Sequence, residues 1–143
     1  MNRVRQGMTL VAVITFAVAA CAGDGPTGNN GGGGTPTLLA NVQPIFNNNC
    51  LFSGCHAGTS PQLGLDLSAG VSFSTSVGVP SNEAPLLRIK AGDPDSSYLL
   101  LKIEGTQGTV GGSGGRMPLG RAALSQDNIN TIRDWILAGA LNN

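Results

Sequence analysis

The stretch Cys50-Leu-Phe-Ser-Gly-Cys55-His56 contains two of the three cysteines of the 143-residue chain and its only histidine. Thiols and imidazoles are side chains that proteins commonly use to hold transition metals. Any imidazole chemistry of this chain must therefore take place at His56. The fold has to place this stretch where its two thiols and its imidazole can meet a common partner.

A cysteine directly followed by a histidine, with a second cysteine upstream, is the outline of a covalent haem attachment site. In the common form, C-x-x-C-H, both sulfurs add to the haem vinyl groups and the histidine ligates the iron. Here the spacing is C-x-x-x-x-C-H. On a straight helix this spacing would turn the two thiols roughly 140° apart, so the intervening residues must leave helical geometry. Gly54 gives the backbone freedom for this, and we expect Cys50 and Cys55 to bind haem and His56 to be an axial ligand.

Two other interpretations of the same stretch remain open. Cys50 and Cys55 could form a short-loop disulfide, which is stable in an exported protein. The other interpretation is a metal site without haem. Structural zinc, however, takes four protein ligands, and no further cysteine or histidine lies nearby.

The first twenty residues predict a secretory signal peptide. Arg3 and Arg5 supply the positive start, and an apolar run extends from Met8 to Ala20. This run is too short to span a bilayer comfortably, and no stop-transfer charges follow it.

The apolar run ends in V-A-A-C, which resembles the lipobox of bacterial lipoproteins. The resemblance implies that Cys21 is acylated, becomes the new N-terminus and carries three acyl chains, enough for stable anchoring. Ala22 in place of an aspartate resembles the lipoproteins that are sorted to the outer membrane. We therefore expect an exported, lipid-anchored protein on the periplasmic side or the cell surface. The alternative is an ordinary cleavage site with Cys21 as an unpaired thiol.

Two regions follow the signal peptide. Residues 21–36 carry the acylated cysteine and a glycine- and asparagine-rich stretch, which predicts a flexible tether. Residues 37–143 are long enough for one small domain with a thin core of its own. Without Arg3 and Arg5 the mature chain has six basic and eight acidic residues, and it shows no basic stripe that would indicate nucleic-acid binding.

Met117 is the only methionine left once the signal peptide is removed, and it follows a glycine-rich stretch at residues 105–116. A thioether is a soft iron ligand, and a histidine and a methionine are the usual axial pair of cytochromes c. We therefore expect Met117 to be the second axial ligand. The alternative is that Met117 merely fills a gap in the core.

The apolar periodicity predicts helices at both ends of the domain. The first covers Thr37–Asn48, although Pro44 should kink it, and the last begins after an N-cap at Ser125 and ends at Gly139. A shorter helix is expected over Tyr98–Ile103, capped by Asp95 or Ser96. Another, capped by Ser68, should run to Val77, and residues 86–90 should be extended.

Together these features resemble the class I cytochromes c, and more narrowly a family of exported bacterial monohaem cytochrome c domains. Such domains have a Q-P-I-F-like helix before the haem motif, then G-D-P-x-x-S-x-L, then R-M-P, then L-S-x-x-x-I-x-x-I-R-x-W-I. The matching residues here are 42–56, 91–101 and 116–140. The resemblance implies a mostly α fold, with N- and C-terminal helices packed around one covalent haem c and long glycine-rich loops. It also implies that Cys50 and Cys55 are the thioether donors and that His56 and Met117 are the axial ligands.

These expectations favour a membrane-anchored electron carrier that exchanges electrons with other redox proteins. With both axial positions filled, the iron would offer no site for a substrate, and no separate catalytic set is evident, so we do not expect an enzyme. One alternative is a redox-inert surface or binding module with a Cys50–Cys55 disulfide. A haem-based sensor, in which a small ligand displaces Met117, is another.

The lipobox leads to a first prediction. Replacing Cys21 by serine should move the protein from the membrane fraction to the soluble fraction, because the thiol that accepts the acyl group is lost. The absorption spectrum should not change, since Cys21 lies outside the predicted domain. A wild-type protein that is already soluble and unacylated would contradict the lipoprotein interpretation.

Overall fold

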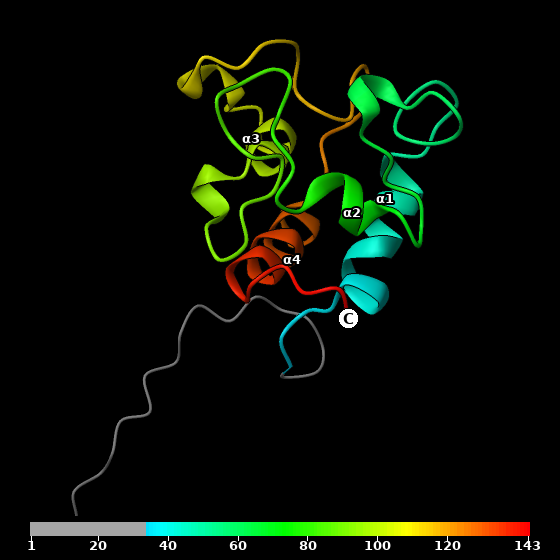
Figure 1. The fold of residues 1–143 in the computed structure, drawn as a ribbon, viewed down its shortest axis with the longest axis vertical. Coiled ribbons are helices and arrows are strands. Elements are labelled where there is room, and N and C mark those ends of the chain that lie inside the picture. Colours follow the sequence, from blue (N-terminus) through cyan, green and yellow to red (C-terminus); the bar gives the residue numbers. More distant parts are fainter. Residues whose placement is uncertain (1–33) are drawn as a thin grey trace, which may run out of the picture.

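The computed structural model describes residues 34–143. The expected signal peptide, Cys21 and all but residues 34–36 of the expected tether lie outside this range. Within it, four α-helices, one π-helical turn and three 3-10 turns make up the regular structure, with three isolated β-bridges and no β-strand (Figure 1). The expected mostly α class is therefore confirmed.

The helix expected before the cysteine motif consists of a π-helical turn, Leu38–Val42, and helix α1, Gln43–Asn49. The Thr37 hydroxyl accepts a hydrogen bond from the backbone N–H of Ala40 at 3.2 Å and so caps the π-helical turn. Pro44 lies at the second position of α1. At the start of a helix its missing N–H costs little, which explains how this proline is accommodated.

The last helix, α4, covers Gln126–Leu137 and is capped as expected, because the backbone N–H of Asn128 donates to the Ser125 hydroxyl at 3.3 Å. One face of α4 is buried in the core together with the first helix. Its apolar side chains there are Ile129, Ile132, Trp135 and Ile136.

The two ends of the domain are also joined directly. The backbone N–H of Leu39 donates to the carbonyl of Asn143 at 2.9 Å, and the N–H of Leu38 donates to the Asn143 side chain at 3.1 Å. Figure 1 shows the C-terminus beside the start of this first helical segment. The expected packing of the terminal helices is confirmed.

The middle of the chain is irregular and contains two short α-helices. Helix α2 covers Ser72–Ser76 and helix α3 covers Tyr98–Glu104, while the 3-10 turns are Gln62–Gly64, Pro94–Ser96 and Gln107–Val110. The residues expected to be extended, 86–90, form the isolated bridges with neighbouring segments.

Both of the caps expected in this region are wrong. Asp93, rather than Asp95 or Ser96, accepts from the N–H of Ser96, and it caps the turn that leads into α3. Ser68 contributes its backbone carbonyl, and not its side chain, to the start of α2. Neither α2 nor α3 has a side-chain cap of its own, since their N-cap residues are Val71 and Ser97 and neither side chain accepts from the helix.

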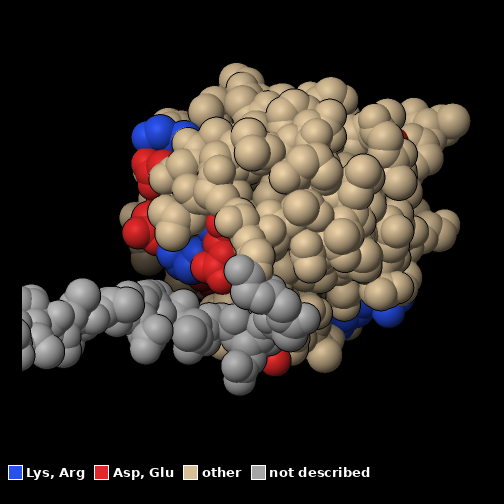
Figure 2. Space-filling view, turned by 90° about the horizontal axis from the view of Figure 1, so that it is seen from below, with Lys and Arg blue, Asp and Glu red and all other residues tan. Residues whose placement is uncertain are grey.

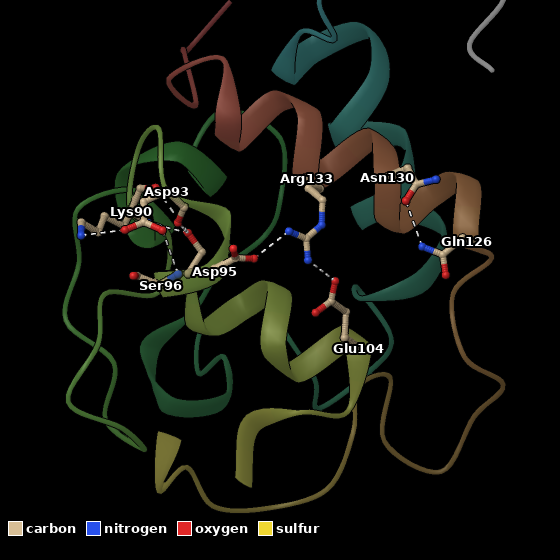
Figure 3. A network of polar contacts seen from close by, with 9 residues as sticks. Lys90, Asp93, Asp95, Ser96, Glu104, Gln126, Asn130 and Arg133 are labelled. Atoms are coloured by element: carbon tan, nitrogen blue, oxygen red, sulfur yellow. Dashed lines mark hydrogen bonds and ion pairs between the residues drawn. The ribbon is translucent and has the colours of Figure 1, made fainter. Parts of the chain in front are cut away.

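An arginine of α4 ties this helix to the region of α3. The Arg133 guanidinium pairs with Asp95 at 2.8 Å and with Glu104 at 2.7 Å, so it binds both the 3-10 turn before α3 and the last residue of α3 (Figure 3). Charged side chains are otherwise few, and most of the face seen in Figure 2 carries none. No helix in residues 34–143 is long and apolar enough to cross a membrane.

The buried face of α4 gives a stability prediction. Ile136 is fully buried, whereas its neighbour Leu137 is 63% exposed. Ile136→Ala should lower the free energy of unfolding by about 2–5 kcal/mol, because it leaves a cavity in the core. Leu137→Ala is the matched control and should change it by less than about 0.5 kcal/mol. Equal effects of the two substitutions in denaturant unfolding would contradict this packing.

Candidate functional site

A cavity of about 560 Å³ lies between the cysteine motif, α3 and the segment after the glycine-rich stretch. Its volume lies within the range of ligand pockets, about 300–1,000 Å³. Cys50, Cys55, His56 and Met117 all line it. Four residues singled out in the sequence, from segments about sixty residues apart, therefore meet at one site.

Most of the cavity wall is apolar. The side chains come from α1, α3, α4 and the loop after the motif, and several of them belong to the hydrophobic core of the domain. They are Phe46, Leu65, Leu67, Leu99, Ile103, Leu124 and Ile132. A wall of this kind favours a large, mainly apolar ligand.

The chain leaves helical geometry between the two cysteines, as the spacing predicted. Cys50 ends α1, and the next residues turn back so that the N–H of His56 donates to the carbonyl of Cys50 at 3.2 Å. Gly54 has a φ of +76°, a conformation that glycine adopts without strain. Both thiols are free, and each is partly buried at the cavity.

The environment of Cys50 favours its neutral thiol over the thiolate. Burial, together with the nearby Cys55 thiol, raises the pKa of Cys50 to about 12. The nucleophile in disulfide exchange is the thiolate, and it is scarce at neutral pH when the pKa is this high. Cys50 therefore does not have the lowered pKa of the attacking cysteine in a dithiol redox catalyst.

The imidazole of His56 is held by the loop that follows it. Its Nδ1 lies 3.1 Å from the backbone carbonyl of Leu65. Because a carbonyl can only accept, Nδ1 carries the proton and donates, and Nε2 keeps its lone pair. A hydrogen bond of this kind orients a metal-binding imidazole and increases its basicity.

The cavity also determines the charge of His56. Burial lowers its pKa below the ordinary value, and the Leu65 carbonyl opposes this shift. The positive charges of Arg88 and Lys102 lower the pKa further, whereas Glu83 raises it. The side chain is therefore neutral at pH 7, which is the form that binds metals.

The glycine-rich stretch before Met117 is attached to α3 at several points. The backbone N–H of Met117 donates to the carbonyl of Lys102 at 2.9 Å, and the Lys102 ammonium donates to the carbonyl of Ser113 at 2.9 Å. A Cβ added at Gly112 would lie 2.5 Å from the Tyr98 ring. Glycine is thus required there for the close approach to α3 that places Met117 at the cavity.

Three charged residues that are buried or partly buried at the cavity were missed in the sequence. Arg88 and Lys102 are buried, and Glu83 is partly buried and pairs with Lys102 at 3.3 Å. Each of the two cations stands within an apolar run, L-L-R-I and L-L-L-K-I-E. A single cation in such a run indicates a buried charge, and this signal could have identified both. The role of the Leu65 carbonyl could not be predicted from the sequence, because every residue has a backbone carbonyl.

The described residues contain no group of three or more His, Cys, Asp and Glu side chains placed to hold a metal ion. Cys21, the expected lipidation site, lies outside them. Comparison of the chain with protein-family models, with curated proteins and with solved structures found no match.

Proposed function

We propose that this protein is a monohaem c-type cytochrome that transfers electrons. The observation that carries the proposal is the convergence of Cys50, Cys55, His56 and Met117 on one apolar cavity. These residues supply the two thiols for covalent attachment and the two side chains for axial ligation. In this proposal the domain has a class I cytochrome c-like fold, in which the terminal helices pack together and irregular loops enclose the cofactor.

The donor set and the cavity fit haem c. Two thiols at one cavity match the two vinyl groups, and the apolar wall suits the porphyrin face. The fit also extends to the imidazole, since Nδ1 is engaged by Leu65 and Nε2 is free to ligate. When bound, the haem supplies one-electron redox chemistry at its iron.

The protein side chains have three tasks in this proposal. His56 would hold the iron through Nε2, and the Leu65 carbonyl fixes the ring orientation. Met117 would hold the iron through its thioether, which favours the reduced iron relative to a nitrogen ligand. An apolar wall around the haem would limit the solvent reorganisation that accompanies electron exchange. With both axial positions filled there is no place for a substrate, which supports a carrier rather than an enzyme.

The proposal extends to the location of the protein. A lipid anchor at Cys21 and a flexible tether would keep the haem domain near the outer membrane while it swings to meet redox partners. A carrier of this kind exchanges electrons with redox proteins, so the proposal includes no nucleic-acid partner and no small-molecule substrate. Figure 2 is in keeping with this, because the charged groups on the face it shows are few and include both signs.

Covalent attachment can be tested one cysteine at a time. In protein made together with a cytochrome c maturation system, Cys50→Ala or Cys55→Ala should leave one thioether bond and one intact vinyl group. The α band of the pyridine haemochrome should then shift to longer wavelength than in the wild type. Cys21→Ala, in which the cysteine lies outside the cavity, should leave the band unchanged. Identical bands in the wild type and both cavity variants would contradict attachment through these thiols.

Axial ligation by Met117 can be tested separately. Met117→Ala should abolish the weak near-infrared band of ferric sulfur–iron ligation and should allow the ferrous protein to bind carbon monoxide. The reduction potential should fall, because the thioether that favours ferrous iron is lost. Met117→His is the matched control, since it should lower the potential without opening the site. If Met117 were only core filler, truncation would cost about 2–5 kcal/mol of stability and leave the near-infrared band intact.

A further inference from the structure

Arg88 is a buried cation on the cavity wall. Its residue surface is 8% exposed, and it lines the same cavity as His56 and Met117. The guanidinium donates to three backbone carbonyls, those of Leu63, Gly64 and Thr75, at 2.5–3.1 Å. These acceptors are neutral, so they accept hydrogen bonds from the guanidinium but do not balance its positive charge.

The other cations differ from Arg88 within residues 34–143. Lys90, Lys102 and Arg133 each have a carboxylate within ion-pair distance. The remaining two, Arg116 and Arg121, are exposed to solvent. Arg88 is thus the buried cation without an anionic partner in the part of the chain that the structure describes.

A buried charge without a counterion is costly. Charged residues are almost never fully buried unless they are paired, because an ion that leaves water loses its favourable hydration. Arginine cannot relieve this cost by losing its proton at any ordinary pH. Burial lowers the pKa of Arg88, but the group remains charged. An anion that enters with the ligand would remove the imbalance.

The charges around the cavity show the same imbalance. Glu83 is the one acidic residue among its lining residues, against the three cations Arg88, Lys102 and Arg121. Glu83 already forms an ion pair with Lys102. Arg121 is exposed to solvent, and its guanidinium lies 3.5 Å from the centre of the Phe52 ring. The other titratable groups that line the cavity are Tyr98, Cys50, Cys55 and His56, and none of them is a carboxylate.

The guanidinium also has hydrogen-bonding capacity left. It carries five N–H groups, and three of its hydrogen bonds are to the protein. The planar arrangement of these donors matches the geometry of a carboxylate. Lysine would supply the charge but not this arrangement.

We propose that Arg88 is the counterion of a carboxylate on the ligand of the cavity, and that this carboxylate is a haem propionate. The inference rests on the proposed function, because it takes haem as the ligand. In this inference Arg88 binds the propionate while it keeps its hydrogen bonds to the carbonyls of Leu63, Gly64 and Thr75. Since Leu65 follows directly and accepts from His56, Arg88 links the edge of the cofactor to the loop that orients its axial ligand.

The holoprotein provides the most direct test, with ¹³C introduced at both propionate carboxyl groups through labelled 5-aminolevulinate. Carbon NMR spectra recorded across a pH range then follow each propionate separately. One propionate should titrate about 1–3 pH units below the other, because the neighbouring guanidinium favours its charged form. Two propionates that titrate together would overturn the proposal, and this measurement requires no variant.

Two substitutions separate a charge partner from a purely structural clamp. Arg88→Met removes the charge, so the low-titrating propionate should move up to the range of the other one. Arg88→Lys keeps the charge and should retain most of the difference. If the methionine and lysine variants titrate alike, Arg88 acts only on the loop and the proposal is wrong. Lys90→Met, which removes an exposed charge outside the cavity, is the control and should titrate like the wild type.

The same samples distinguish this inference from the proposed function. A wild-type protein without covalent haem would overturn both, as its absorption spectrum would show at once. A haem-containing protein whose propionates do not differ would overturn only the role of Arg88. The proposal that the protein transfers electrons through a haem ligated by His56 and Met117 would not be affected.

Discussion

The candidate site depends on the hydrogen bond between the His56 ring and the Leu65 carbonyl. This contact determines which imidazole nitrogen is free at the cavity, and it closes the loop that begins at Cys50. The loop is held from the other side as well, because Arg88 binds the carbonyls of Leu63 and Gly64 just before Leu65. A neutral imidazole with a free Nε2 is thus part of the folded chain and does not depend on the ligand for its orientation.

The second requirement is that Met117 face the same cavity from a different part of the chain. Lys102 contributes twice, since its carbonyl binds the N–H of Met117 and its ammonium binds the carbonyl of Ser113. Helix α3, which carries Lys102, is in turn bridged to α4 by Arg133 (Figure 3). The contacts that close the domain therefore also hold the segment that carries Met117 at the cavity that His56 lines.

Local signals in the sequence predicted much of this architecture, and non-local ones were missed. Ser125 and the isoleucines of α4 were sufficient to predict the last helix, because an N-cap and a 3.6-residue apolar period are both properties of a single helix. The cap at Asp93 was missed because several neighbouring polar residues could serve equally well in the sequence. Cys50, Cys55, His56 and Met117 stood out by residue type, and the structure places all four at one cavity. The roles of Arg88 and of the Leu65 carbonyl depend on contacts between distant segments, and a backbone acceptor has no residue type to identify it.

The central claim is that the four converging residues hold one covalent haem. The most direct test is the intact mass of the wild-type domain, made together with a cytochrome c maturation system and measured after acid-acetone extraction. The account predicts the mass of the polypeptide plus one haem, with no free thiol at Cys50 or Cys55. A mass equal to that of the polypeptide alone, with a disulfide between these two cysteines, would contradict it.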